Sequence, residues 1–167
     1  MKGLENSDYK RSKIKIAFYT LGCKLNFSET SSISRTFSKD IYTIVPFNSK
    51  ADIYIINSCS VTDNADKKTK SLVNKVLKIN VNGFIVAIGC YAQLKPKEIS
   101  EIEGIDLVIG ANEKFRLVEY INDLYEKKIN KINSCDISKV NFFNDAYSLG
   151  ENRTRSFLKV QDGCDYK

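Results

Sequence analysis

The chain has 167 residues, of which 43% are hydrophobic, so it can bury the core of one domain of ordinary size. Its formal net charge of +6 is compatible with an anionic partner such as nucleic acid, although a lysine-rich surface alone gives the same balance. The chain contains no histidine, which excludes Ser-His-Asp and Cys-His catalysis, zinc sites that use histidine, and Rieske-type clusters.

Short apolar runs alternate with longer amphipathic runs between Ile14 and Ser138, a pattern typical of βαβ units. The candidate strands span residues 14–20, 41–45, 52–57, 84–89 and 106–110. They are almost uniformly apolar, as expected for strands that are buried on both faces. The sequence therefore predicts an α/β fold: an open parallel sheet of about five strands in the flavodoxin-like order, with helices on both faces.

Capping residues and helical spacing predict the helices between these strands. The first helix is expected to begin at Asn26, with Glu29 completing a capping box and with Ile33 and Phe37 forming a narrow apolar stripe. Because the capping box accounts for Asn26 and Glu29 without any chemistry, both are interpreted as capping residues.

A surface helix is expected over residues 65–78, where apolar positions recur at helical spacing. Its outward face carries Lys67, Lys68, Lys70, Lys75 and Lys78. This face is interpreted as solvated, although it can also approach anionic RNA. A short helix from Pro96 to Gly104 is expected next, followed by one that begins at Asn112. The last helix should pack Val118, Ile121 and Tyr125 inward.

The regular pattern is lost after Ser138, and this divides the chain. We interpret residues 1–12 as an N-terminal tail, 13–138 as the α/β domain, 139–155 as an irregular linker and 156–167 as the beginning of a second domain. That last segment opens with an apolar strand from Ser156, for which the sequence offers no pairing partner.

Three of the five cysteines follow apolar strands, as in IAFYTLGC, IYIINSC and FIVAIGC. Parallel strands end at one edge of a sheet, and the first, third and fourth strands are neighbours in the predicted order, so Cys23, Cys59 and Cys90 should meet there. Adjacent strands lie ~4.8 Å apart, so these thiols can surround one cluster. Three thiolates fit an iron–sulfur cluster with one open iron, whereas structural zinc takes a fourth protein ligand.

Other interpretations of the cysteines are considered beside this one. A single cysteine is most simply a small buried apolar residue, and Cys135, which follows no strand, is interpreted in that way. No export signal or long apolar run is present, so a reducing cytoplasmic location without disulfides is expected. The spacing excludes a phosphatase loop and a CxxC redox pair. A flavin- or nucleotide-binding module and a metal-free structural domain remain alternatives.

Four motifs, LGCKLNFSET, INSCSVTDNADKK, GCYAQ and KVQDGC, resemble in sequence and order the methylthiotransferase family of radical S-adenosylmethionine enzymes. The resemblance covers nearly the whole chain. It implies that Cys23, Cys59 and Cys90 ligate an auxiliary [4Fe-4S] cluster on an N-terminal α/β domain. It also implies a radical S-adenosylmethionine barrel beyond that domain, whose CxxxCxxC motif holds a second [4Fe-4S] cluster and binds S-adenosylmethionine.

Cys164 is the one cysteine of this second motif that the chain contains, because the next would fall just past Lys167. The resemblance therefore implies that residues 156–167 are the first strand of a truncated barrel. It also implies an enzyme only as part of the full-length protein. The fragment itself should contain no catalytic residue and should be inert.

In full-length relatives, the resemblance implies that sulfur from the auxiliary cluster and a methyl group from S-adenosylmethionine are added to an adenosine of tRNA. Lys24, VTDNAD and GCYAQ favour the branch that acts on threonylcarbamoyladenosine next to the anticodon. Branches that act on isopentenyladenosine or on a ribosomal protein are kept as alternatives. The expected partner is tRNA, and no membrane partner is expected.

Overall fold

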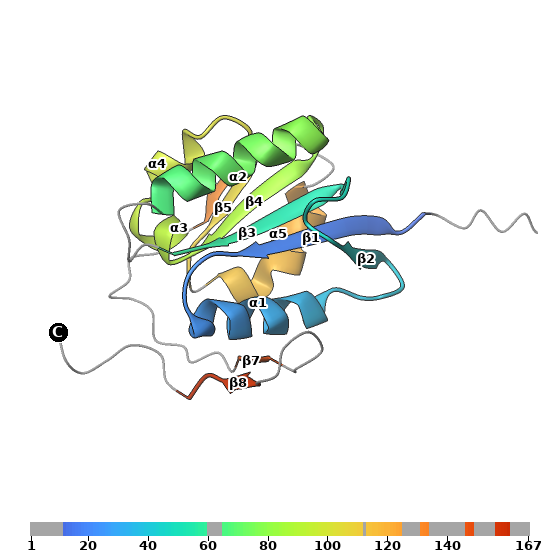
Figure 1. Ribbon diagram of the computed structural model, residues 1–167. Helices are drawn as coiled ribbons and strands as arrows, with labels where there is room; N and C mark the ends of the chain where they lie inside the picture. The colour runs from blue at the N-terminus through green and yellow to red at the C-terminus, as the bar shows by residue number, and fades with distance from the viewer. Residues whose placement is uncertain are drawn as a thin grey trace, which may run out of the picture.

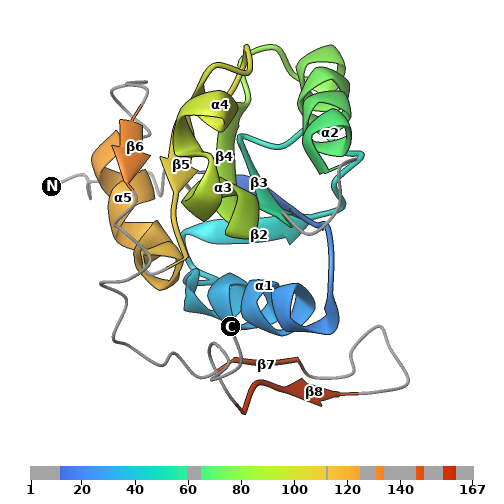
Figure 2. The same ribbon diagram turned by 90° about the vertical axis from the view of Figure 1, so that its left-hand side faces the viewer.

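The computed structural model describes residues 12–59, 65–111, 113–124, 131–133, 146–148 and 156–160. The main sheet has six parallel strands in the order β2-β1-β3-β4-β5-β6. Figure 1 labels β1 to β5, and Figure 2 shows β6 beside β5. Their bounds are β1 Ile14–Thr20, β2 Tyr42–Val45, β3 Ile53–Ser58, β4 Phe84–Gly89, β5 Leu107–Ile109 and β6 Lys131–Asn133. All five predicted strands are present in the predicted flavodoxin-like order. The edge strand β6 was not predicted, since its three residues include one apolar side chain.

Helices cover both faces of the sheet, as predicted (Figures 1 and 2). One face is covered by α2 (Ala65–Ile79), α3 (Cys90–Leu94) and α4 (Pro96–Ser100). The other is covered by α1 (Lys24–Thr36) and α5 (Leu117–Leu124), which follows the 3₁₀ turn η1 (Lys114–Arg116). Within the described ranges, no helix is long and apolar enough to cross a membrane.

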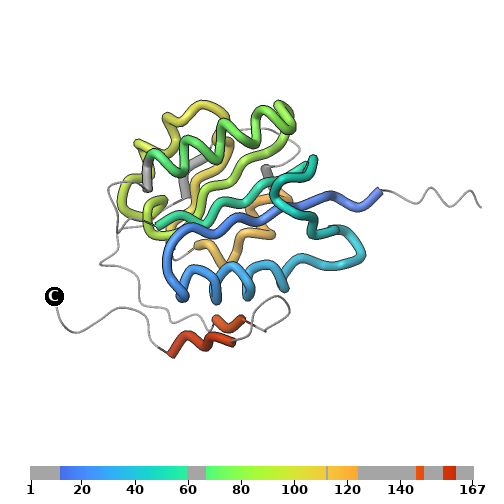
Figure 3. Tube along the Cα trace, viewed as in Figure 1, coloured from blue at the N-terminus to red at the C-terminus, as the bar shows by residue number. Residues whose placement is uncertain are grey.

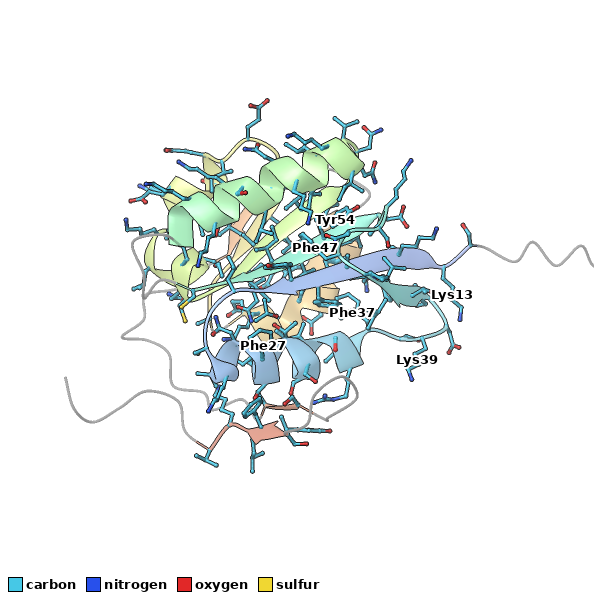
Figure 4. All side chains as sticks on the ribbon, in the orientation of Figure 1. Lys13, Phe27, Phe37, Lys39, Phe47 and Tyr54 are labelled. Carbon is cyan, nitrogen blue, oxygen red and sulfur yellow. The ribbon has the colours of Figure 1, made fainter. Side chains whose placement is uncertain are left out.

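The core is divided in two by the sheet, because successive side chains of a strand point to opposite faces. In β3, Tyr54 and Ile56 join the cluster under α2, while Ile53 and Ile55 join the cluster under α1. All four are fully buried, and each such side chain stabilises the fold by about 1.5–3 kcal/mol. Figure 4 shows Tyr54 on the face near α2 and labels Phe37, which lies on the face near α1.

The predicted helices are present, with differences at their ends. The lysine face of α2 is exposed and its Val73 and Val76 are buried, as predicted. The helix from Pro96 ends at Ser100, because the chain then turns toward Gly104, whose φ of +96° is outside helical geometry. The last helix begins at Leu117 rather than at position 112, and Asn112 and Tyr125 lie outside the described residues.

The chain returns to α1 far along the sequence, as the trace in Figure 3 shows. Strands β7 (Tyr147–Ser148) and β8 (Phe157–Leu158) pair antiparallel beside α1 (Figure 2). The Arg35 guanidinium of α1 stacks on the Tyr147 ring, with its Cζ 3.9 Å from the ring centroid. Its Nη2 also donates to the Tyr147 carbonyl oxygen at 2.8 Å. The expected strand near Ser156 is therefore present, but the prediction that it lacks a partner is wrong. Its partner lies within the predicted linker, where two residues are too few for a periodic signal.

We expect Gly89→Ala to lower the free energy of unfolding by about 2 kcal/mol or more. Gly89 has a φ of +100°, and a Cβ there would clash with Asn57 Oδ1 and with the Ser58 carbonyl oxygen. Urea denaturation measures the change. The control is Ser71→Ala on the exposed face of α2, which should stay within about 0.5 kcal/mol of the original protein. Equal stability of the two variants would contradict the argument.

Candidate functional site

The three predicted cysteines lie at the carboxyl ends of three adjacent parallel strands. Cys23 follows β1 and immediately precedes α1, Cys59 follows β3, and Cys90 follows β4 as the first residue of α3. The strands are held in register by pairing of Thr20 with Asn57 and of Ser58 with Gly89. The structure thus places all three cysteines along one edge of the sheet, which we call the cysteine edge.

The loop that carries Cys23 passes directly over Cys59, and a glycine permits the approach. A Cβ on Gly22 would lie 2.6 Å from Cys59 Cβ and 2.9 Å from Cys59 Sγ. Gly22 also has a φ of +107°, which L side chains rarely adopt. Both observations require glycine at this position if the first two cysteines are to stay together.

The three cysteines carry free thiols that differ in exposure. Cys23 is exposed, whereas Cys59 and Cys90 are half-buried. Burial raises the pKa of the Cys90 thiol; nearby Lys114 lowers it, while Glu29 and the other two cysteines raise it further. Cys90 is therefore within electrostatic range of both other thiols. A thiolate at Cys90 needs a compensating positive charge, from a metal or from the protein.

The chemistry of the three thiols fits a thiolate-bound cluster, whereas their arrangement in the structure does not yet form a metal site. Among the residues that the structure describes, no three cysteine or acidic side chains are already gathered as a metal site. The three thiols share one edge of the sheet. Their chemistry matches iron–sulfur ligation, which uses cysteine thiolates. Cys135 and Cys164 lie outside the described residues.

The prediction that Asn26 and Glu29 form a capping box is wrong. Helix α1 begins at Lys24 with Cys23 as its N-cap residue, and that end has no side-chain capping hydrogen bond. Asn26 is instead 1% exposed, and its Nδ2 donates to the carbonyl oxygens of Leu21 at 2.8 Å and Ser58 at 3.4 Å. It therefore ties the loop before Cys23 to the strand end before Cys59. The sequence feature that could have indicated this role was the three-residue spacing of Cys23, Asn26 and Glu29. This spacing suits one face of a helix as well as a cap.

A buried polar network continues from Asn26 across the strand ends. Asn57 Nδ2 donates to the Asn26 carbonyl oxygen at 3.1 Å and to Thr30 Oγ1 at 3.0 Å. Ser58 Oγ donates to the Ile88 carbonyl oxygen at 2.7 Å and so joins β3 to β4. Among the described residues, Asn57 Oδ1 has no hydrogen-bond partner. These contacts fix the ends of the strands that precede Cys59 and Cys90.

Glu29 forms a second buried contact that the sequence did not reveal. It is 2% exposed, and its carboxylate accepts from Lys114 Nζ at 2.6 Å and from Lys159 Nζ at 3.5 Å. The resemblance associates Lys24 with the threonylcarbamoyladenosine branch. Its Nζ lies 5.6 Å from the centroid of the Phe157 ring. Helix α1 therefore contacts the segment around β8 through two lysine side chains, one of its own and one of that segment.

Comparison of the sequence with known proteins identifies the family of this chain. Residues 15–110 match the family described as "Uncharacterized protein family UPF0004". The chain is 38% identical over 152 residues to threonylcarbamoyladenosine tRNA methylthiotransferase MtaB of Bacillus subtilis (strain 168), covering 90% of this chain and 34% of the relative. It is 34% identical over 156 residues to MtaB of Aquifex aeolicus, covering 91% of this chain and 37% of the relative.

A further relative acts on a protein, according to its name. The chain is 31% identical over 158 residues to ribosomal protein uS12 methylthiotransferase RimO of Clostridium kluyveri, covering 92% of this chain and 35% of the relative. The chain spans about a third of the length of the curated relatives that it matches. These findings confirm the resemblance that the four motifs indicated. The chain belongs to the UPF0004 family and is similar over about nine tenths of its length to proteins named as methylthiotransferases.

Proposed function

We propose that this chain is the domain of a tRNA methylthiotransferase that holds an auxiliary [4Fe-4S] cluster through Cys23, Cys59 and Cys90. One observation carries the proposal: three free thiols follow three adjacent parallel strands in a chain without histidine. Three thiolates leave one iron of a four-iron cluster without a protein ligand. When bound, such a cluster would supply sulfur to the substrate.

The residues around the thiols support this role by holding the ligands in place. Gly22 lets the Cys23 loop approach Cys59, and Asn26 binds the backbone on both sides of that approach. Ser58 joins the strand that precedes Cys59 to the strand that precedes Cys90. Because Cys23 is exposed, a bound group would be open to solvent and to substrate on that side.

The proposed substrate is threonylcarbamoyladenosine next to the anticodon of tRNA. The supporting observation is the order of similarity: MtaB relatives of three species are 34–38% identical to the chain, although that of Rickettsia prowazekii is 29% identical. The uS12 enzyme is 31% identical, and two tRNA-2-methylthio-N(6)-dimethylallyladenosine synthases are 29% and 31% identical. Substrates of these other branches are the alternatives that the test below separates.

The remaining parts of the proposal concern the full-length enzyme, whose place of action would be the cytoplasm. Residues 1–12 are a tail, 13–138 the cluster domain, 139–155 a linker and 156–167 the start of the radical S-adenosylmethionine domain. In that domain Cys164 would be one of three ligands of a second [4Fe-4S] cluster that binds S-adenosylmethionine. Strand β7, which falls in the proposed linker, pairs with β8.

We expect that changing Cys23, Cys59 or Cys90 to alanine abolishes retention of the cluster, because each removes one of three thiolate ligands. Iron and acid-labile sulfide, measured after anaerobic reconstitution and desalting, should fall from about four of each per chain to near zero. Cys135→Ala is the matched control and should retain the full content. A requirement for Cys135, or dispensability of any one of the three, would contradict the ligand assignment.

A second prediction concerns the substrate. Deleting the gene should remove the methylthio group from threonylcarbamoyladenosine in total tRNA, while the unmethylthiolated nucleoside accumulates. Mass spectrometry of nucleosides measures both, and a plasmid copy of the gene should restore the product. Loss of the methylthio group from isopentenyladenosine instead, or from ribosomal protein uS12, would contradict the branch assignment and leave the cluster prediction standing.

A further inference from the structure

One face of α2 carries a single sign of charge from Lys67 to Lys78. The seven exposed positions in this stretch are five lysines, Ser71 and Asn74, and none of them is acidic. At about 3.6 residues per turn, these positions fall on one half of the helix surface, while Val73 and Val76 on the other half are buried against the sheet. We call this surface the α2 lysine face; its lysines are Lys67, Lys68, Lys70, Lys75 and Lys78.

The lysines of this face have no acidic neighbour that balances them. None of the five forms an ion pair with another residue that the structure describes. Elsewhere on the surface cations are paired, as Arg116 is with Glu119 at 2.7 Å. Lysines three positions apart, such as Lys67 and Lys70, repel one another along a helix. Because a helix face that serves solubility alone is better stabilised by mixed charges, this arrangement indicates a partner that supplies the negative charge.

The α2 lysine face begins beside the cysteine edge. Helix α2 joins β3 to β4, and because these strands are parallel, it begins near their carboxyl ends and runs back toward their amino ends. Figure 1 shows the first turn of α2 on the side of the molecule where α3, which begins at Cys90, also lies. From Lys67 to Lys78 the face extends for about 16 Å along the helix axis, a length that spans several phosphates of a nucleic acid strand.

The chemistry of the α2 lysine face favours a nucleic acid over a protein as its partner. Lysine ammonium groups bind phosphate oxygens as point charges, whereas protein interfaces are depleted in lysine and use aromatic and apolar anchors. Among the described residues, none of the exposed large hydrophobic side chains lies on α2. Phosphate contacts hold a nucleic acid in position without reading its bases, so they suit a surface that neighbours a reactive site.

We propose that the α2 lysine face binds the phosphate backbone of the substrate tRNA and holds the tRNA beside the cysteine edge. This inference deepens the proposed function and rests on it, because it takes tRNA to be the substrate. It gives this domain a share in binding tRNA in addition to holding the cluster. The binding is electrostatic, so it weakens as salt releases the contacts between ammonium groups and phosphates.

The test is binding of purified tRNA to this chain, measured by fluorescence anisotropy over a series of salt concentrations. The triple variant Lys67→Gln, Lys70→Gln and Lys78→Gln should bind about tenfold or more weakly near a salt concentration of about 100 mM. The slope of log affinity against log salt concentration should become shallower by about 2, because three phosphate contacts are lost. Glutamine has nearly the helix propensity of lysine, so circular dichroism should show an unchanged helix content.

The matched control removes three exposed lysines at the opposite edge of the sheet. Lys15, Lys39 and Lys50 lie at or just before the amino ends of β1, β2 and β3, and they are exposed. Changing all three to glutamine lowers the net charge by the same amount and should leave both affinity and slope nearly unchanged. An equal loss of affinity in the two triple variants would show that net charge alone attracts tRNA, and would overturn the proposal.

A competition experiment separates RNA from an acidic protein as the partner. Labelled tRNA should be displaced by unlabelled tRNA, and not by polyglutamate at an equal concentration of charge. Equal displacement by both overturns the assignment to RNA. No measurable binding of tRNA to the unchanged chain at low salt overturns it as well. If the triple variant does not fold, Lys70→Gln alone should make the salt slope shallower by just under about 1, and an unchanged slope overturns the proposal.

Iron and sulfide measured in the same samples distinguish this inference from the proposed function. The α2 variants should retain the full iron and sulfide content, because none of the substituted lysines is a proposed ligand. Full content together with unchanged tRNA binding overturns the inference and leaves the cluster assignment intact. Absence of iron and sulfide from the unchanged protein, by contrast, would overturn the cluster assignment whatever the tRNA affinity.

Discussion

Parallel pairing of β1, β3 and β4 is the constraint on which the rest of the structure depends. These strands point in the same direction, so the residues that follow them are brought to one edge without any contact among the cysteines themselves. Strands β3 and β4 are buried along their whole length on both faces. A shift of one residue in register would exchange the two halves of the core, so packing fixes the relative positions of the cysteines.

Buried polar side chains at the cysteine edge fix the positions of its segments further. Asn26, Asn57 and Ser58 are buried, and buried polar groups are costly unless they form hydrogen bonds. Their contacts connect α1, β3 and β4 at the place where the cysteines begin. Apolar packing would tolerate small shifts of these segments, whereas directional hydrogen bonds allow one arrangement. The cysteine edge is therefore defined more sharply than the core alone would define it.

Local patterns predicted most of the sheet, because strands buried on both faces are conspicuous as apolar runs. The same reasoning predicted that Cys23, Cys59 and Cys90 share an edge, and the motifs around them identified the family. Asn26 and Glu29 were assigned wrongly. A polar residue spaced for a cap can equally lie one turn inside a helix, and long-range partners decide between the two.

The missed features share one physical cause, which is their dependence on distant partners. Glu29 is buried because Lys114 and Lys159 reach it, and neither lysine carries a local sign of burial. β7 and β8 are each two residues long, so their pairing depends on the contact with α1 rather than on strand propensity. Sequence periodicity cannot report interactions of this kind, because it measures neighbours along one element.

The packing of residues 146–160 on α1 has a consequence for the order in which the chain can complete its fold. Ser32 binds Tyr147 across 115 positions of sequence, and Glu29 binds Lys159 across 130. During synthesis, the sheet from β1 to β5 emerges from the ribosome long before either partner exists. Contacts between such distant positions close large loops and form late in folding. Helix α1, which follows Cys23, can therefore complete its contacts only when nearly the whole of this chain has been synthesised. Until then, the Glu29 carboxylate lacks its contact with Lys159.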